Sequence, residues 1–284
     1  MEIPLAEAQK QATQEKAAHI DLLTVAAIAV VTALLDSITH EGLGHGLTAL
    51  LLGLHPRYIS TVALDVSYAG FPAWKGRLVD AAGCGSQILM ALLILGLMRW
   101  TPKTNATTRY FLWLFSTTNL IIAGGYLLVP TFLGFGDWES FVHDLPSPLA
   151  WKIGLELFGL CISLLGLYLG ARNLDPFVGR ATIGAETRFR RYQKLVYTPY
   201  LVIGTVATLA SIFNPAGALL ILVSGVAASF GGNGFMLGML FFARKSFSTT
   251  PETVITPTRN WLWLWLGLLA LFIEFFVLGP GLPR

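Results

Sequence analysis

The sequence predicts an all-α polytopic membrane protein with about seven transmembrane helices and a short β-strand or hairpin after the first. The chain has 284 residues, of which 54% are hydrophobic and only 12% are charged, whereas soluble domains carry about 25% charged residues. Its mean hydropathy is +0.64, and its uncharged runs reach the roughly 20 residues that a bilayer crossing requires. A water-soluble globule is therefore excluded. The lipid bilayer is the expected partner, and the net charge of +3 does not indicate nucleic-acid binding.

The apolar runs follow a polar N-terminal segment of mixed charge, residues 1–19. They lie at 20–54, 78–99, 110–134, 150–171, 195–213, 217–243 and 261–279. As one straight helix, the first run would be about 51 Å long, against a hydrocarbon core of about 30 Å. We therefore expect it to be tilted, bent or interrupted, most readily at Gly42, Gly44 and Gly46, where glycine weakens a helix.

The basic residues predict the orientation. With seven crossings, only Arg57, Lys75, Arg77, Lys152 and Arg284 of the 19 Lys and Arg residues fall on one face. The others gather on the face that carries the N-terminus. Because cytoplasmic loops are enriched in Lys and Arg, we expect a multi-pass protein with a cytoplasmic N-terminus and a C-terminus outside.

One segment has the pattern of a strand. From Arg57 to Phe71, β-branched and aromatic residues alternate with small or polar ones, and the segment ends at Gly70 and Pro72. This pattern predicts a short strand or hairpin on the face opposite the N-terminus.

The candidate chemistry lies within the first apolar run, in the sequence HEGLGHG at 40–46. Ionisable groups at membrane depth are costly and are functional by default. His40 and His45 are five residues apart, which separates them by about 140° around a regular α-helix. Two geometries would bring metal ligands together. A π-bulge at Gly42 and Gly44 would align the two histidines, or a regular helix would pair Glu41 with His45 and leave His40 as a supporting residue or base.

This part of the chain resembles the site-2 protease family of intramembrane zinc metallopeptidases, in their compact bacterial form. The resemblance rests on THEGLGHGLTALLLG at 39–53, LVDAAGCGSQILMALLIL at 78–95 and NLIIAGGYLLVPTFLGFGDWESF at 119–141. It implies a metallopeptidase-like membrane core over 20–145, with additional transmembrane helices over 146–284. The chain departs from the family's HExxH motif by one inserted residue, and it lacks the family's LDG sequence.

The resemblance also implies a third zinc ligand, an aspartate on a later helix. The best match is Asp137 in GFGDW, and Asn119 is a weaker match to the family's motif asparagine. His45 should lie about 12 Å below the face that the third crossing reaches just before Asp137. Asp175 would lie on the opposite face and is disfavoured. Asp80, Glu139, His143 or no third protein ligand remain alternatives.

We therefore expect a zinc metallohydrolase that cleaves a membrane-protein or peptide substrate. His40, His45 and Asp137 would hold Zn²⁺, and Glu41 would act as the catalytic base toward the attacking water. Two alternatives stay open. One is a metal-dependent enzyme acting on a lipid or small amphiphile, and the other is a transporter or sensor that binds the metal without turnover.

Overall fold

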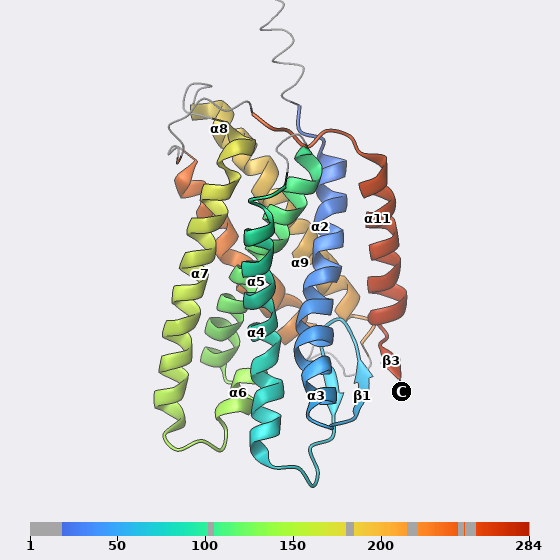
Figure 1. The fold of residues 1–284 in the computed structure, drawn as a ribbon, viewed down its shortest axis with the longest axis vertical. Helices are drawn as coiled ribbons and strands as arrows, with labels where there is room; N and C mark the ends of the chain where they lie inside the picture. Colours follow the sequence, from blue (N-terminus) through green and yellow to red (C-terminus); the bar gives the residue numbers. More distant parts are fainter. Residues whose placement is uncertain are drawn as a thin grey trace, which may run out of the picture.

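The computed structural model describes residues 19–101, 105–179, 185–214, 221–243, 247 and 254–283, which form an elongated and mostly helical bundle (Figure 1). Apart from residue 19, the predicted N-terminal segment lies outside the described residues. Five helices are long and apolar enough to cross a membrane, namely Leu22–Leu51, Ala73–Leu97, Ala106–Leu133, Pro148–Val178 and Trp261–Leu278. Their length and composition support a membrane protein.

The first of these helices contains α2 (Leu22–Ser37), the π-helix η1 (Ile38–Gly46) and α3 (Leu47–Leu51). The next three are α4 (Ala73–Leu97), α5 (Ala106–Leu133) and α7 (Pro148–Val178). The last comprises α11 (Trp261–Phe272) and the π-helix η6 (Ile273–Leu278).

The other two predicted crossings are helical but are not among these five. Residues 195–213 fall mostly on η3 (Gln193–Tyr197) and α9 (Thr198–Ser211), which follow α8 (Ala185–Tyr192). Residues 221–243 form η4 (Ile221–Gly232) and η5 (Asn233–Phe242), while 217–220 lie outside the described residues. The structure thus does not confirm a count of seven.

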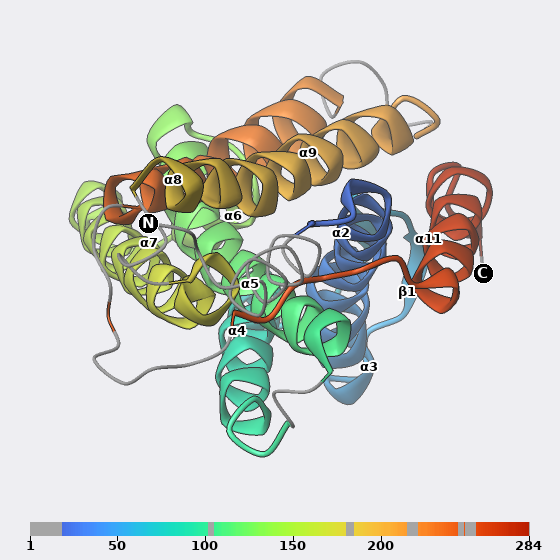
Figure 2. The same ribbon diagram turned by 90° about the horizontal axis from the view of Figure 1, so that it is seen from above.

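Helix α2 lies inside the bundle, in contact with α5, α9 and α11 (Figure 2). Helix α5 packs in turn on α4 and α7. Small residues permit the α5–α7 approach, because a Cβ on Gly124 would lie 2.6 Å from the Ser163 nitrogen and 2.7 Å from the Gly159 oxygen. Without a hydrophobic driving force in lipid, such close packing is what holds transmembrane helices together.

Polar side chains cap the starts of α2 and α11. The Asp21 side chain accepts a hydrogen bond from the Thr24 nitrogen at 2.8 Å, and the Asn260 side chain accepts one from the Trp263 nitrogen at 3.3 Å. Such caps satisfy backbone N–H groups that have no partner within the helix. An ion pair of 2.8 Å between Arg259 and Asp21 joins the two helix starts.

A small sheet lies at the other end of the bundle, beside α3 (Figure 1). Strands β1 (Pro56–Ile59) and β2 (Leu64–Val66) pair antiparallel, and β3 (Leu282–Pro283) pairs with the other edge of β1. The short helix α6 (Asp137–Val142) lies between α5 and α7 in the chain and packs against α4. The segment η1, which carries the two histidines, contacts β1, β2 and α4. The sheet and α6, which packs on α4, therefore both lie close to the histidines.

Candidate metal centre

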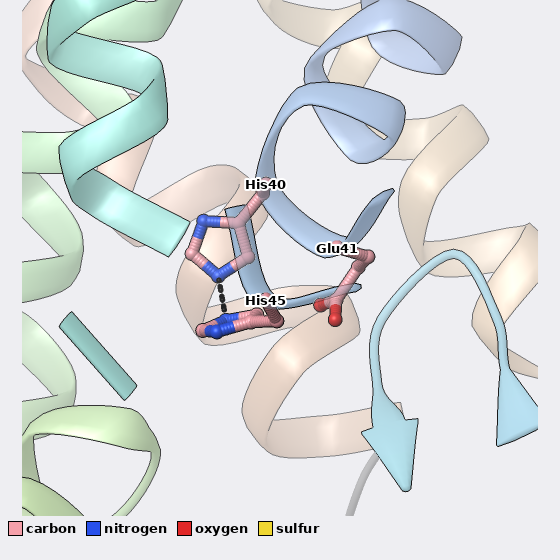
Figure 3. A group of neighbouring side chains, drawn as sticks. All are labelled: His40, Glu41 and His45. Atoms are coloured by element: carbon pink, nitrogen blue, oxygen red, sulfur yellow. Dashed lines mark hydrogen bonds between the residues drawn. The ribbon is translucent and has the colours of Figure 1, made fainter. Parts of the chain in front are cut away.

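The π-helix η1 brings the two histidines together. Its wider turn places residues five apart on one side, so the His40 and His45 rings meet with their Nε2 atoms 3.1 Å apart (Figure 3). The rings are nearly perpendicular, at 83°. Of the two geometries that the sequence allows, the structure adopts the π-helical one, at the glycine cluster.

Asp137 reaches the same point from α6. Its Oδ2 atom lies 3.3 Å from His40 Nε2 and 3.1 Å from His45 Nε2. The turn before it needs glycine, because Gly134 and Gly136 have φ angles of 75° and 80°, in the left-handed region. Next to Asp137, the buried Trp138 donates a hydrogen bond from Nε1 to Cys84 Sγ on α4. This contact anchors α6 and so positions the Asp137 carboxylate.

Supporting hydrogen bonds orient both imidazoles. His45 Nδ1 lies 2.6 Å from the Val79 carbonyl oxygen, which can only accept, so Nδ1 carries the proton. His40 Nδ1 lies 3.1 Å from Gln87 Oε1 and donates in the same way. In metal-binding histidines, such outer partners fix the tautomer and turn the other nitrogen toward the ion. Both Nε2 atoms are thereby left facing Asp137.

Glycine allows α4 to come this close. A Cβ on Gly83 would lie 2.5 Å from His45 Nε2 and 2.7 Å from His40 Nε2, and one on Gly44 would lie 2.6 Å from the Gly83 Cα. The backbone of α4 therefore forms one wall of the site. Any side chain at position 83 would enter the space where the two rings meet.

The arrangement fits a divalent metal ion. Nitrogen and oxygen ligands about 2.0–2.2 Å from a tetrahedral zinc lie about 3.3–3.5 Å from one another, and the three atoms of His40, His45 and Asp137 are separated by 3.1–3.3 Å. Shifts of a few tenths of an ångström would complete the fit. Three acceptor atoms that converge in a buried place need a shared cation, either protons on the rings or a metal.

The charge of Asp137 agrees with this requirement. When protons on the two rings supply that cation, burial by itself would raise the pKa of the Asp137 carboxyl, but the positive charge of His45 and the hydrogen bonds from both histidines outweigh burial. The pKa of Asp137 therefore lies below its ordinary value, and the group is a carboxylate at neutral pH.

Glu41 stands beside the histidines without being bonded to them (Figure 3). His40, Glu41 and His45 each offer one ligand atom within 4.8 Å of the others, so this group could hold a metal ion. Among the described residues, none forms a hydrogen bond with the Glu41 carboxylate. That carboxylate lines a cavity of about 210 Å³ together with His45, Asp137 and Tyr68. It is thus free to accept a proton from a molecule in that cavity.

The other sequence candidates lie apart from the converging atoms. Asp80 lines the same cavity but is not part of the group of three. Glu139 forms an ion pair with Lys152. His143 is exposed and pairs with Asp144 at 2.9 Å, and Asp175 is paired with Arg188 at 3.1 Å in a buried contact. Asn119 contacts Asp36 and not the histidines.

Sequence reasoning did not find several residues around the site. Gln87 and Asp36 carried a usable signal, because each is a polar residue inside an apolar run. Tyr126, whose ring centroid lies 5.4 Å from that of His40, and Tyr68 carried none. Burial and the charges of Asp80 and Asp137 raise the pKa of Tyr68 to about 12. Its hydroxyl therefore remains a hydrogen-bond donor at neutral pH.

Comparison of the whole chain with protein-family profiles, with curated proteins and with solved structures finds no match.

Proposed function

We propose that the protein is a membrane-embedded metallohydrolase of the site-2 protease kind, which hydrolyses peptide bonds in or near the membrane. One observation carries the proposal. Two imidazole nitrogens, each turned inward by a hydrogen bond on its other nitrogen, converge with one carboxylate oxygen inside an apolar bundle. No packing requirement of an apolar helix accounts for such a group at that depth.

In this proposal His40, His45 and Asp137 hold a zinc ion. Such an ion, when bound, polarises a substrate carbonyl and lowers the pKa of an attacking water. Gln87 and the Val79 carbonyl keep the histidines in the tautomer that presents Nε2. Asp137 supplies the negative charge that partly balances the cation.

Glu41 acts as the general base and acid. Its buried carboxylate, beside His45 and on the wall of the cavity, takes a proton from the attacking water and returns it to the amine of the leaving peptide. The phenol of Tyr68, which lines the same cavity, donates a hydrogen bond to the substrate carbonyl oxygen as negative charge develops there. The apolar bundle around these groups limits access of bulk water.

The proposal includes the topology expected from the sequence. Seven crossings, a cytoplasmic N-terminus and an outside C-terminus would place the metal centre near the outer face. The substrate would then be a membrane protein or peptide whose helix unwinds near that face. Fusion of a reporter to each terminus would test this orientation.

Metal analysis of purified protein tests the centre itself. We expect about one equivalent of zinc in the wild type and in His143→Ala, the exposed histidine that serves as the matched control. His45→Ala and Asp137→Asn should lose most of it. A wild type without stoichiometric metal, or a His45→Ala protein that keeps it, would exclude a metal centre.

Glu41→Gln separates catalysis from ligation. If Glu41 is the base, the variant keeps its zinc, loses hydrolysis and retains bound substrate. If Glu41 is a ligand instead, the variant loses zinc. Comparison of membrane-protein fragments in cells with the wild type and with Glu41→Gln should show cleavage products only with the wild type. Unchanged fragment patterns with zinc retained would favour a metal-binding transporter or sensor.

A further inference from the structure

A second cavity adjoins the metal centre on the side of α2 that faces α5, α9 and η4. Its volume is about 100 Å³, and Glu41, His40 and Tyr126 form one part of its wall. The remainder is mostly apolar, with Ala33 and Ile203 among the lining residues. Glu41 and Tyr126 also line the larger cavity beside Asp137, so the proposed catalytic base forms part of the wall of both cavities.

Asp36, on this wall, is a buried acidic residue with one oxygen that lacks a hydrogen-bond partner among the described residues. It is only 5% exposed. Its Oδ1 atom accepts hydrogen bonds from Asn119 Nδ2 at 2.6 Å and Thr118 Oγ1 at 3.3 Å, whereas Oδ2 is buried and has no hydrogen-bond partner among the described residues. A buried carboxylate oxygen without a donor is costly. The mechanism proposed above does not use it.

A second acceptor on the same wall is also unsatisfied. Thr61, in the connection between β1 and β2, is 6% exposed and lines the cavity, and within the described part of the chain its Oγ1 atom has no hydrogen-bond partner. None of the residues that line the cavity is a lysine or arginine. The cavity wall thus combines apolar residues with polar ones and carries no basic side chain among the described residues, and both Asp36 and Thr61 belong to this wall.

The spacing along α2 matches one kind of side chain. Asp36 precedes His40 by four residues, which is about 6 Å along a helix. The four-carbon stem of an extended lysine places its ammonium about 6 Å from its Cα atom. A peptide held at the metal centre could thus direct a lysine along the cavity as far as Asp36.

We propose that this cavity is a specificity subsite that accepts a lysine side chain of the substrate, with Asp36 as the residue that recognises its ammonium group. The subsite rests on the proposed peptidase function. The Asp36 and Thr61 side chains would turn their buried oxygens toward the cavity to accept from the ammonium, and the methylene stem would pack on Ala33 and Ile203. A compact ammonium with three rotatable donors suits two separate acceptors better than the flat guanidinium of arginine.

Paired hydroxamates test the subsite through binding, without need of turnover. N-acetyl-lysine hydroxamate and N-acetyl-norleucine hydroxamate share the metal-binding group and the apolar stem, but only the first carries an ammonium. On zinc-loaded wild-type protein in nanodiscs, we expect calorimetry to show at least about tenfold tighter binding of the lysine compound, as a charged hydrogen bond provides. Asp36→Asn should reduce that ratio to about one and leave norleucine binding and zinc content unchanged.

Two further variants make the result specific. Asp80→Asn, which removes an aspartate from the wall of the other cavity, should preserve the ratio. Ala207→Leu, which narrows the proposed subsite from α9, should weaken both hydroxamates and leave zinc content unchanged; this arm decides the question if Asp36→Asn does not fold.

The outcomes separate the two proposals. Equal affinity of the wild type for both compounds, or a preference that persists in Asp36→Asn, overturns the subsite while the metal centre stands. Failure of zinc-loaded protein to bind either hydroxamate also overturns it. Protein that binds no zinc overturns the proposed function, and the subsite with it.

Discussion

Gly83→Ala is the sharpest test of the metal centre, because it adds one methyl group and removes no ligand. The added Cβ would lie 2.5 Å from His45 Nε2, 2.6 Å from His40 Cε1 and 2.7 Å from His40 Nε2. Ordinary contact needs about 3.5 Å or more, so the rings or the α4 backbone must move by nearly 1 Å. Metal sites tolerate errors of about 0.2 Å in ligand distance.

We therefore expect Gly83→Ala to lower zinc affinity by at least tenfold, while overpacking destabilises the bundle by about 1–3 kcal/mol. Competition with a chelator of known affinity would measure the first effect, and thermal unfolding the second. Gly85→Ala is the matched control, since a Cβ there meets no atom of the described residues within 4 Å. Wild-type zinc affinity in Gly83→Ala would refute the placement of the two rings against α4.

Three further outcomes follow from the same structure. Gln87→Met should lower zinc affinity about 10–100-fold, because the His40 ring loses the partner that orients it; an unchanged chelator competition curve would count against that role. Gly124→Ala should lower the unfolding temperature without changing zinc content, since its clash is with α7 and not with the site; loss of zinc would contradict this separation. Asp21→Asn should destabilise the protein at neutral pH but not in strong acid. Burial of Asp21 raises its carboxyl pKa, but hydrogen bonds from Thr24 and Arg259 outweigh burial, so the pKa in the folded protein lies below its ordinary value. The stabilisation by the ionised Asp21 is therefore present above the pKa of the unfolded state. It is lost as the pH falls through the pKa of the folded state. Equal destabilisation at both pH values in thermal unfolding would argue against the cap.

Much of the helical architecture was predictable because helices that lie in lipid consist of long runs of uncharged, apolar residues. A backbone in hydrocarbon must satisfy its own hydrogen bonds, so uncharged runs of sufficient length become helices. This is why the runs at 78–99 and 110–134 correspond closely to α4 and α5. The count of crossings was less secure, because 217–243 contains a change from π-helix to 3₁₀-helix at Gly232 and not one regular helix.

The candidate site was predictable only in part. His40, Glu41 and His45 were evident as ionisable residues in an apolar run, and their spacing left two geometries open, a π-bulge or a regular helix that pairs Glu41 with His45. Gln87 and Asp36 followed the same rule, but Gln87 lies in another apolar run, and the position of Asp36 one turn before His40 did not by itself assign it to the site. Gln87 joins His40 only because α4 packs on η1.

The sequence by itself showed that the chain has uncharged runs long enough to cross a membrane and that three ionisable residues lie within six positions of one run. Composition and short-range spacing are local properties, and they are sufficient for both conclusions. Only the tertiary structure decided that Asp137 meets His40 and His45, that Glu139 and His143 do not, and that Asp36 lines a separate cavity. Those relations depend on how closely α4, α5 and α6 approach α2 and η1, and glycines at positions 44 and 83 permit the approach of α4 to η1.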